Sequence, residues 1–172
     1  MVIATRSGRI RRILERILRR LPQKDRLAIE AFVGRVRCGR AWGTYAFGSM
    51  VDGRAAALFP RAPTARGAER QAELVLYLPV CRLFSDKALT GIVAHGLAHA
   101  VRAVSLGEGW WRLLGDRWKQ EERKADLLAM RWGFAPELHA SAQEQVRVVL
   151  PRIEESERHI VTSIARRISS RS

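Results

Sequence analysis

The apolar positions near the start of the chain follow a helical period. Residues 9–21 place aliphatic side chains three or four positions apart, with arginine in most of the intervening places. On a helix this spacing collects the aliphatic residues in one stripe and the arginines on the opposite face. The stripe consists of Ile10, Ile13, Leu14, Ile17, Leu18 and Leu21. We predict a basic amphipathic helix that ends at Pro22, and a second helix from Gln23 to Arg37.

The pattern then changes to short apolar runs bounded by turn residues. Strands are predicted at Trp42–Met50, Ala55–Phe59 and Glu73–Val80, with Asp52-Gly53 and a proline- and glycine-containing segment between them. The last run, E-L-V-L-Y-L-P-V, is the clearest, because it combines aliphatic and aromatic residues with a proline near its end.

From residue 85 the helical period returns and continues to the end of the sequence. Helices are predicted at Ser85–Ser105, Trp110–Trp118, Lys119–Trp132, Leu138–Leu150 and Ile153–Ile168. The first of them contains Gly91 and Gly96, each of which costs a helix about 1 kcal/mol relative to alanine. A glycine inside a helix also lets another backbone or a ligand approach closely. Each glycine therefore calls for a structural or functional reason.

These elements predict an α+β fold in a single domain of 172 residues. We expect a core at 41–135, with a small sheet of about three strands and two central helices. A basic helical part at 1–40 and a helical part at 136–172 would flank it. A hydrophobic fraction of 47% argues against disorder.

Composition adds expectations about location and partners. The sequence contains no apolar run of the roughly 18 residues that a membrane span needs, and its start lacks the pattern of a secretion signal, so we expect a cytoplasmic protein. Cys38 and Cys81 are too few for a disulfide framework and fit reduced thiols. The 31 Lys and Arg against 17 Asp and Glu give a net charge of +14. That charge favours nucleic acid, an anionic membrane surface or an acidic protein, unless arginine is simply frequent in this coding background.

Two histidines stand four residues apart in the helix predicted at Ser85–Ser105. His95 and His99, in H-G-L-A-H, would lie one turn apart on one face and could hold one metal ion. A catalytic zinc site needs a third protein ligand. The helix predicted at Lys119–Trp132 contains Glu122, which could be that ligand. Asp126, one turn later, could accept a hydrogen bond from a ligand imidazole.

This constellation resembles the gluzincin branch of the zincin metallopeptidases, whose motifs are H-E-x-x-H and, on a later helix, E-x-x-A-D. The resemblance covers roughly residues 73–134. It implies a zinc ion held by His95, His99 and Glu122, with Asp126 steadying a ligand. It also implies that extended peptide pairs with the strand before the metal helix, at Leu74, Leu76 and Leu78.

Gly96 occupies the position of the catalytic glutamate in that motif. The glutamate is the general base and proton carrier, and such groups contribute roughly 10²–10⁴-fold to a rate. Glu108 is the one candidate replacement, since Glu121 should point about 100° away from Glu122 around its helix. Trp110, Trp111 and Trp118 could line a cleft or lie in the core, and Cys81 fits a buried thiol better than a nucleophile. His139 and His159 are expected on polar helix faces.

Three functions remain open at this point. The first is a zinc-peptidase-like protein without its general base, which binds metal and peptide as a regulatory module. The second is a nucleic-acid-binding protein that uses its basic terminal helices on a zincin scaffold. The third is an active peptidase that carries an inactivating change at Gly96. A buried helix with two unrelated histidines would yield none of the three.

Overall fold

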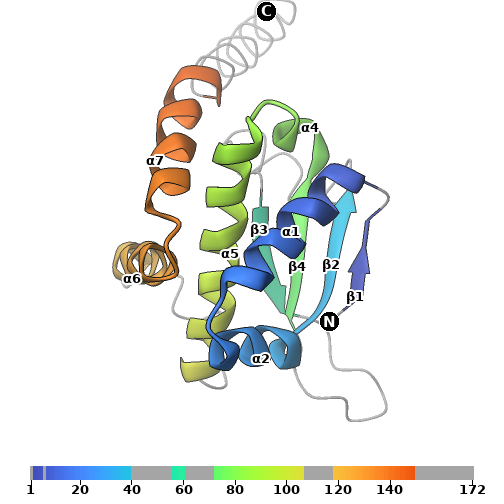
Figure 1. Ribbon diagram of the computed structural model, residues 1–172, viewed down its shortest axis with the longest axis vertical. Helices are drawn as coiled ribbons and strands as arrows, with labels where there is room; N and C mark the ends of the chain where they lie inside the picture. Colours follow the sequence, from blue (N-terminus) through green and yellow to red (C-terminus); the bar gives the residue numbers. More distant parts are fainter. Residues whose placement is uncertain (1, 6, 40–55, 61–71, 107–117, 150–172) are drawn as a thin grey trace, which may run out of the picture.

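A mixed four-stranded sheet forms one side of the protein in the computed structural model, which describes residues 2–5, 7–39, 56–60, 72–106 and 118–149. The strands are β1 (Val2–Ala4), β2 (Val33–Gly39), β3 (Ala56–Pro60) and β4 (Ala72–Tyr77). Their order across the sheet is β1-β2-β4-β3 (Figure 1). β1, β2 and β4 are parallel, whereas β3 is antiparallel to β4. β4 is therefore an inner strand, and β3 is an outer strand of the described sheet.

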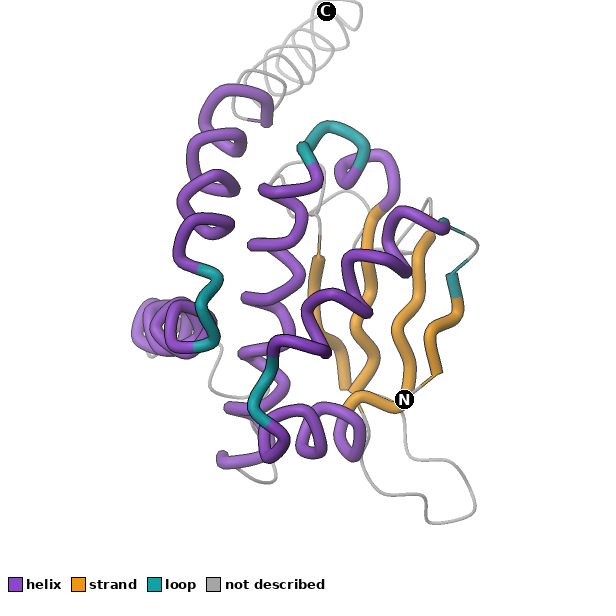
Figure 2. The backbone as a smooth tube through the Cα atoms, viewed as in Figure 1, coloured by secondary structure: helices purple, strands orange, loops and turns teal. Residues whose placement is uncertain are grey.

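The described helices pack around this sheet and are named in the order of the sequence. α1 (Gly8–Arg20) and α2 (Gln23–Phe32) connect β1 to β2, and the short α4 (Leu78–Cys81) follows β4. The long helix α5 (Asp86–Leu106) comes next, then α6 (Trp118–Arg131), α7 (Ala135–Glu144) and a π-helical turn η2 (Gln145–Val149). Figure 2 shows α1 and α5 together over the sheet, with α6 and α7 on the far side of α5.

The α+β class is confirmed, and several elements lie where the sequence predicts them. β3 and β4 agree with the second and third predicted strands, and α5 and α6 agree with the predicted metal helix and its partner. The sheet has four described strands rather than about three. The predicted elements at Trp42–Met50 and Ile153–Ile168, and all but the last residue of Trp110–Trp118, lie outside the described residues.

Several boundaries differ from prediction. The helix predicted at Leu138–Leu150 begins at Ala135 and becomes π-helical from Gln145, and at two other places a different element takes over part of the predicted one. The second helix ends at Phe32 rather than Arg37, because residues 33–39 form β2. A register irregularity between Val33 and Arg35 interrupts the alternation by which a strand is recognised. The run predicted as one strand up to Val80 ends at Tyr77, because Pro79 lies in the first turn of α4, where a proline fits without loss of a hydrogen bond.

One hydrophobic core extends from α1 to α7. Ile10, Ile13, Leu14 and Ile17 of α1 are at most 1% exposed and share a cluster with side chains of β2, β4, α5, α6 and α7. The apolar stripe of the first helix is thus core, and only its arginine face meets solvent. No helix in the described parts of the chain has the length and apolar character needed to cross a membrane.

α7 runs beside α5 in the opposite direction (Figure 1). Near one end of the pair, the Ser85 amide donates to Glu144 Oε2 at 2.7 Å and the Ser85 hydroxyl to Oε1 at 2.6 Å. Further along, the helices approach so closely that a Cβ atom on Gly91 would lie 2.3 Å from the carbonyl oxygen of Glu137. Gly91 is therefore explained by a helix–helix contact that a side chain would prevent.

Arg20 ties the end of α1 to the start of α7. Its guanidinium donates to the Gly133 carbonyl at 2.6 Å and to Glu137 Oε1 at 2.8 Å, and it lies 4.0 Å from the centre of the Phe134 ring. The Trp132 indole donates to Asp25 Oδ2 at 2.7 Å and so links the end of α6 to α2. These contacts fix the position of α6, which supplies part of the site described next.

Candidate metal centre

The two histidines lie on one face of α5, as their spacing predicts. The Nε2 atoms of His95 and His99 are 3.0 Å apart, and the two rings are nearly perpendicular, with an interplanar angle of 82°. The side chains of His95 and His99 are 23% and 20% exposed, so the site is partly accessible to solvent. Both rings thus present a nitrogen to the same point in space.

Glu122 of α6 completes a group of three. Its Oε2 lies 3.2 Å from His95 Nε2, and its Oε1 lies 3.0 Å from His99 Nε2. In the described part of the chain, these three residues are the one group of histidine, cysteine and acidic side chains placed to hold a metal ion. The structure therefore brings together the three residues that the sequence predicts as ligands.

Asp126 lies behind His95, one helical turn beyond Glu122. Its Oδ1 is 2.8 Å from His95 Nδ1. A carboxylate at this nitrogen holds the Nδ1 proton, so the lone pair of the neutral ring is left on Nε2, facing Glu122. This is the orienting contact that the sequence predicts for Asp126.

The carboxylates shift the ionisation of the site. Burial alone would lower the pKa of His95, but hydrogen bonds to Asp126 and Glu122 outweigh it and raise the pKa from 6.5 to about 9. Burial would likewise raise the pKa of Glu122, but hydrogen bonds from His95 and His99 lower it from 4.5 to about 2. Glu122 is thus a carboxylate at neutral pH, the form that binds metal.

No arrangement of protons satisfies all three contacts among these groups. Each ring Nε2 can carry one proton at most, and an ionised carboxylate carries none. If both nitrogens are protonated, two N–H groups face each other across 3.0 Å. If either Nε2 is unprotonated, its lone pair faces an oxygen of the Glu122 carboxylate, across 3.0 Å for His99 or 3.2 Å for His95. A cation at the centre removes this conflict, because both nitrogens and the carboxylate would then direct lone pairs at it.

An ion pair next to the site holds α6 against α5. Arg102 of α5 donates to Glu121 Oε2 through Nε at 2.7 Å and through Nη2 at 2.5 Å, and Lys124 donates to Oε1 at 2.9 Å. Glu121 thus turns away from the histidines, as its place on the helix predicts. Sequence reasoning missed the role of Arg102, although it stands three residues after His99 and carries the charge that Glu121 needs.

Gly96 lies on the side of α5 that faces the sheet, one residue after His95 and so about 100° from it around the helix. A Cβ atom there would lie 3.3 Å from Leu74 Cδ1 of β4, closer than ordinary contact. The neighbour is the tip of a leucine side chain, which can shift by a few tenths of an ångström. The position that carries the general base in zincins is therefore buried, but backbone does not block it.

The strand predicted to hold extended peptide is not available for that role. β4 is hydrogen-bonded to β2 on one side and to β3 on the other, so its backbone has no free edge. Leu74 and Leu76 are fully buried in the core, and Leu78 belongs to α4. The assignment of these three residues to substrate binding is wrong, because the sequence does not reveal which strand is outermost.

The remaining candidates do not join the site. Burial, together with the charge of nearby Cys38, raises the pKa of Cys81 to about 12, so its thiol stays protonated and is a poor nucleophile. His139 is exposed on α7. Glu108, Trp110, Trp111 and His159 lie outside the described residues, and Trp118 is the first residue of α6.

Comparisons of the chain with protein families, curated proteins and solved structures found no match. The resemblance to gluzincins therefore rests on the motifs of this chain and on the geometry of His95, His99, Glu122 and Asp126.

Proposed function

We propose that this protein binds one zinc ion through His95, His99 and Glu122, and that it is a zincin-like module without the general base of the active peptidases. The observation that carries this proposal is the convergence of two imidazole nitrogens and a carboxylate, on two different helices, in contacts that protons cannot satisfy together. Asp126 supports it, because metal-binding histidines commonly donate their second N–H to a carboxylate.

The spacing of the three groups suits zinc. Tetrahedral zinc with bonds of about 2.0–2.1 Å to nitrogen and oxygen separates its ligand atoms by about 3.3 Å. The two Nε2 atoms are 3.0 Å apart, and each lies 3.0 or 3.2 Å from a different oxygen of Glu122, so modest side-chain adjustments would bring two nitrogens and one carboxylate oxygen to this spacing. Two histidines and one glutamate also form a known catalytic zinc set with one open position.

The chemistry available to such a site is limited by Gly96. Zinc would supply Lewis-acid polarisation of a substrate oxygen. Asp126 orients the His95 ring through its contact with Nδ1. Among the described carboxylates, only Asp126 and the proposed ligand Glu122 contact the histidines. Because none of the described residues is placed to carry a proton between attacking and leaving groups, we propose slow hydrolysis at most, and binding as the main activity.

The outer strand β3 is the place where extended peptide could add to the sheet. β3 pairs with β4 along one edge only within the described sheet, and α5 packs against it, so its other edge is near the helix that carries both histidines. Peptides commonly bind by adding a strand to such an edge. This replaces β4 in the peptide-binding part of the proposal.

Metal content tests the proposal directly. Protein purified without added metal should contain about one zinc per chain, and His99→Ala should lose it, because two remaining ligands hold zinc weakly. His139→Ala is the matched control, since it removes an exposed histidine on α7 that lies outside the group. Elemental analysis and circular dichroism on all three proteins separate loss of metal from loss of fold.

Two results would overturn the proposal. One is wild-type protein that stays free of metal after dialysis against zinc. The other is a folded His99→Ala variant that retains a full equivalent of zinc, which would place the ion elsewhere.

A further inference from the structure

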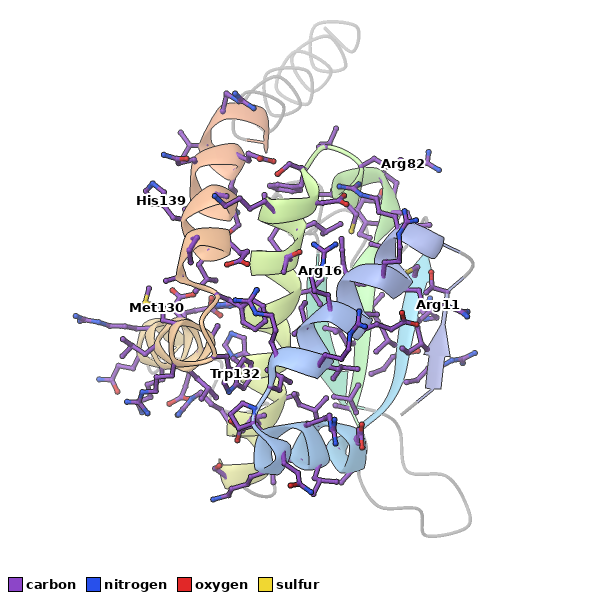
Figure 3. The ribbon with its side chains drawn as sticks, in the orientation of Figure 1. Arg11, Arg16, Arg82, Met130, Trp132 and His139 are labelled. Carbon is purple, nitrogen blue, oxygen red and sulfur yellow. The ribbon has the colours of Figure 1, made fainter. Side chains whose placement is uncertain are left out.

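The outward face of α1 is a row of arginines. Arg11, Arg12, Arg16 and Arg19 are all exposed, and Glu15 is the one acidic side chain among them. Figure 3 shows Arg11 and Arg16 projecting from α1. On the opposite face of the same helix, Ile10, Ile13, Leu14 and Ile17 are at most 1% exposed, and Leu18 is partly buried. We refer to Arg11, Arg12, Arg16 and Arg19 as the α1 arginine row.

The side chains of the α1 arginine row make few contacts with the rest of the described protein. Arg9 and Arg20, at the two ends of α1, form ion pairs with Asp86 and Glu137 and serve the structure. In contrast, Arg12, Arg16 and Arg19 make no hydrogen bond or ion pair with any described residue, and Arg11 makes one long contact of 3.4 Å with the Thr5 carbonyl. Within the described part of the chain, no acidic side chain neutralises the charges of Arg12, Arg16 and Arg19.

The burial of the apolar stripe decides which partner fits. A basic amphipathic helix binds membranes by inserting its apolar face among the lipid chains. Here that face is already packed against the core, so α1 can offer charge but no apolar surface. The large apolar side chains that are exposed in the described chain are Leu27, Val104, Leu127, Met130 and Val146. None is aromatic, so the described surface has no large ring on which unpaired bases would stack.

We propose that the α1 arginine row binds the phosphate backbone of double-stranded nucleic acid without reading its sequence. From Arg12 to Arg19 the helix rises by about 10 Å, and a duplex carries one charge per about 1.7 Å of its axis, so the row faces several phosphates. Arginine suits this role because its planar guanidinium pairs with phosphate oxygens in two-pronged fashion. The net charge of +14 adds attraction at longer range. This surface is independent of the metal centre.

The salt dependence of binding to a labelled DNA duplex tests the proposal. Four phosphate contacts predict a slope of about −3.6 in log affinity against log salt, and about 100-fold weaker binding at about 200 mM than at about 50 mM salt. The double variant Arg12→Ala and Arg16→Ala removes two contacts, so the same change in salt should weaken binding only about tenfold.

The matched control is Arg123→Ala with Arg131→Ala. Both residues are exposed on α6, and the pair loses the same charge as the α1 variant. We expect this control to keep the wild-type slope. Thermal melting of both variants checks that the fold is intact, which is expected because all four side chains are exposed.

Each alternative has a distinct outcome. Equal loss of slope in the α1 and α6 variants would show a general charge effect and overturn the proposal. Absence of duplex binding at about 50 mM salt would do the same. Binding to phosphatidylserine vesicles but not to DNA would assign the row to membranes, and stronger binding to a single strand than to the duplex would contradict backbone recognition of a double helix.

Discussion

Gly96 is where the motif of this chain departs from the zincin pattern, and the structure shows what surrounds that position. The residue is buried on the side of α5 that faces β4, with Leu74 Cδ1 as its nearest neighbour. A glutamate there would be partly desolvated, which raises a carboxyl pKa and suits a general base. The same desolvation would cost stability. A glutamate at position 96 would therefore fit with a small shift of Leu74, and it would lower the free energy of unfolding.

We expect Gly96→Glu to raise hydrolysis of an unstructured protein substrate by about 10²-fold or more, if the glutamate makes its usual contribution. Gly96→Gln is the matched control, because it has the same size and no proton-carrying carboxylate. Adding Leu74→Val to both variants shortens the side chain that a residue at 96 would contact. Rates should be measured with zinc content on every protein.

A Gly96→Glu protein that keeps zinc and is no faster than Gly96→Gln would argue against a peptidase-like cleft. Hydrolysis by the wild type at ordinary peptidase rates would show instead that another group supplies the base. Glu108→Gln would then be the next variant to measure.

Side-chain positions on a single helix could be predicted well from the sequence. The phase of His95 and His99 on α5, and of Glu122 and Asp126 on α6, follows from helical period alone, and the structure has all four as expected. Arg102 could not be assigned in this way. Its contact with Glu121 depends on how α5 and α6 pack against each other, which the sequence of either helix alone does not specify.

At the scale of the helix, α5 contains two glycines in different surroundings. A methyl group at Gly91 would meet the Glu137 carbonyl of α7 at 2.3 Å, and backbone cannot move aside cheaply. At Gly96 it would meet the tip of Leu74 at 3.3 Å. A substitution at Gly91 thus tests the contact between α5 and α7, whereas one at Gly96 tests a contact with a flexible side chain.

Gly91→Ala should therefore destabilise the protein by about 1–3 kcal/mol or more, because α7 must move away from α5. Gly96→Ala should be near neutral, since the gain of up to about 1 kcal/mol in helix propensity offsets the contact with Leu74. Urea unfolding of both variants measures the difference. If the two substitutions had equal effects, α7 would not be packed on α5 as described.

Strand pairing could not be predicted as well as helical phase. A run of buried residues in β4 agrees with a strand covered on both faces, but the sequence does not state which neighbours it pairs with. β1 has three residues, too few for a pattern, and β2 carries a register irregularity. The peptide-binding assignment was wrong for this reason, since an edge is a property of the whole sheet.

At the scale of the whole molecule, the group of His95, His99 and Glu122 links stability to pH. In metal-free protein the pKa of His95 is raised from 6.5 to about 9, so its stabilising effect is complete below pH 6.5 and is lost as pH rises through 9. The pKa of Glu122 is lowered from 4.5 to about 2, so its effect is present above pH 4.5 and is lost as pH falls through 2. The two together favour the range between pH 4.5 and 6.5.

We therefore expect the free energy of unfolding, measured with chelator present, to fall between pH 6.5 and 9, with a slope that approaches about 1.4 kcal/mol per unit. Asp126→Asn should flatten this slope, because it removes the carboxylate at His95 Nδ1. An unchanged slope in that variant would mean that other groups cause the dependence. Excess zinc should reverse the trend, since metal binds the deprotonated imidazole.

The burial of α1 has a further consequence during synthesis. The helix is completed at Arg20, but the helix that helps cover its apolar stripe, α5, begins only at Asp86. At about 5–20 residues per second, a ribosome needs several seconds to make the chain between them. Throughout that time the aliphatic positions of this basic segment lack the α5 side chains that help cover them in the folded protein, and basic amphipathic segments of this kind bind anionic membranes. The finished protein has covered those positions, so the nascent and the folded chain would select different partners.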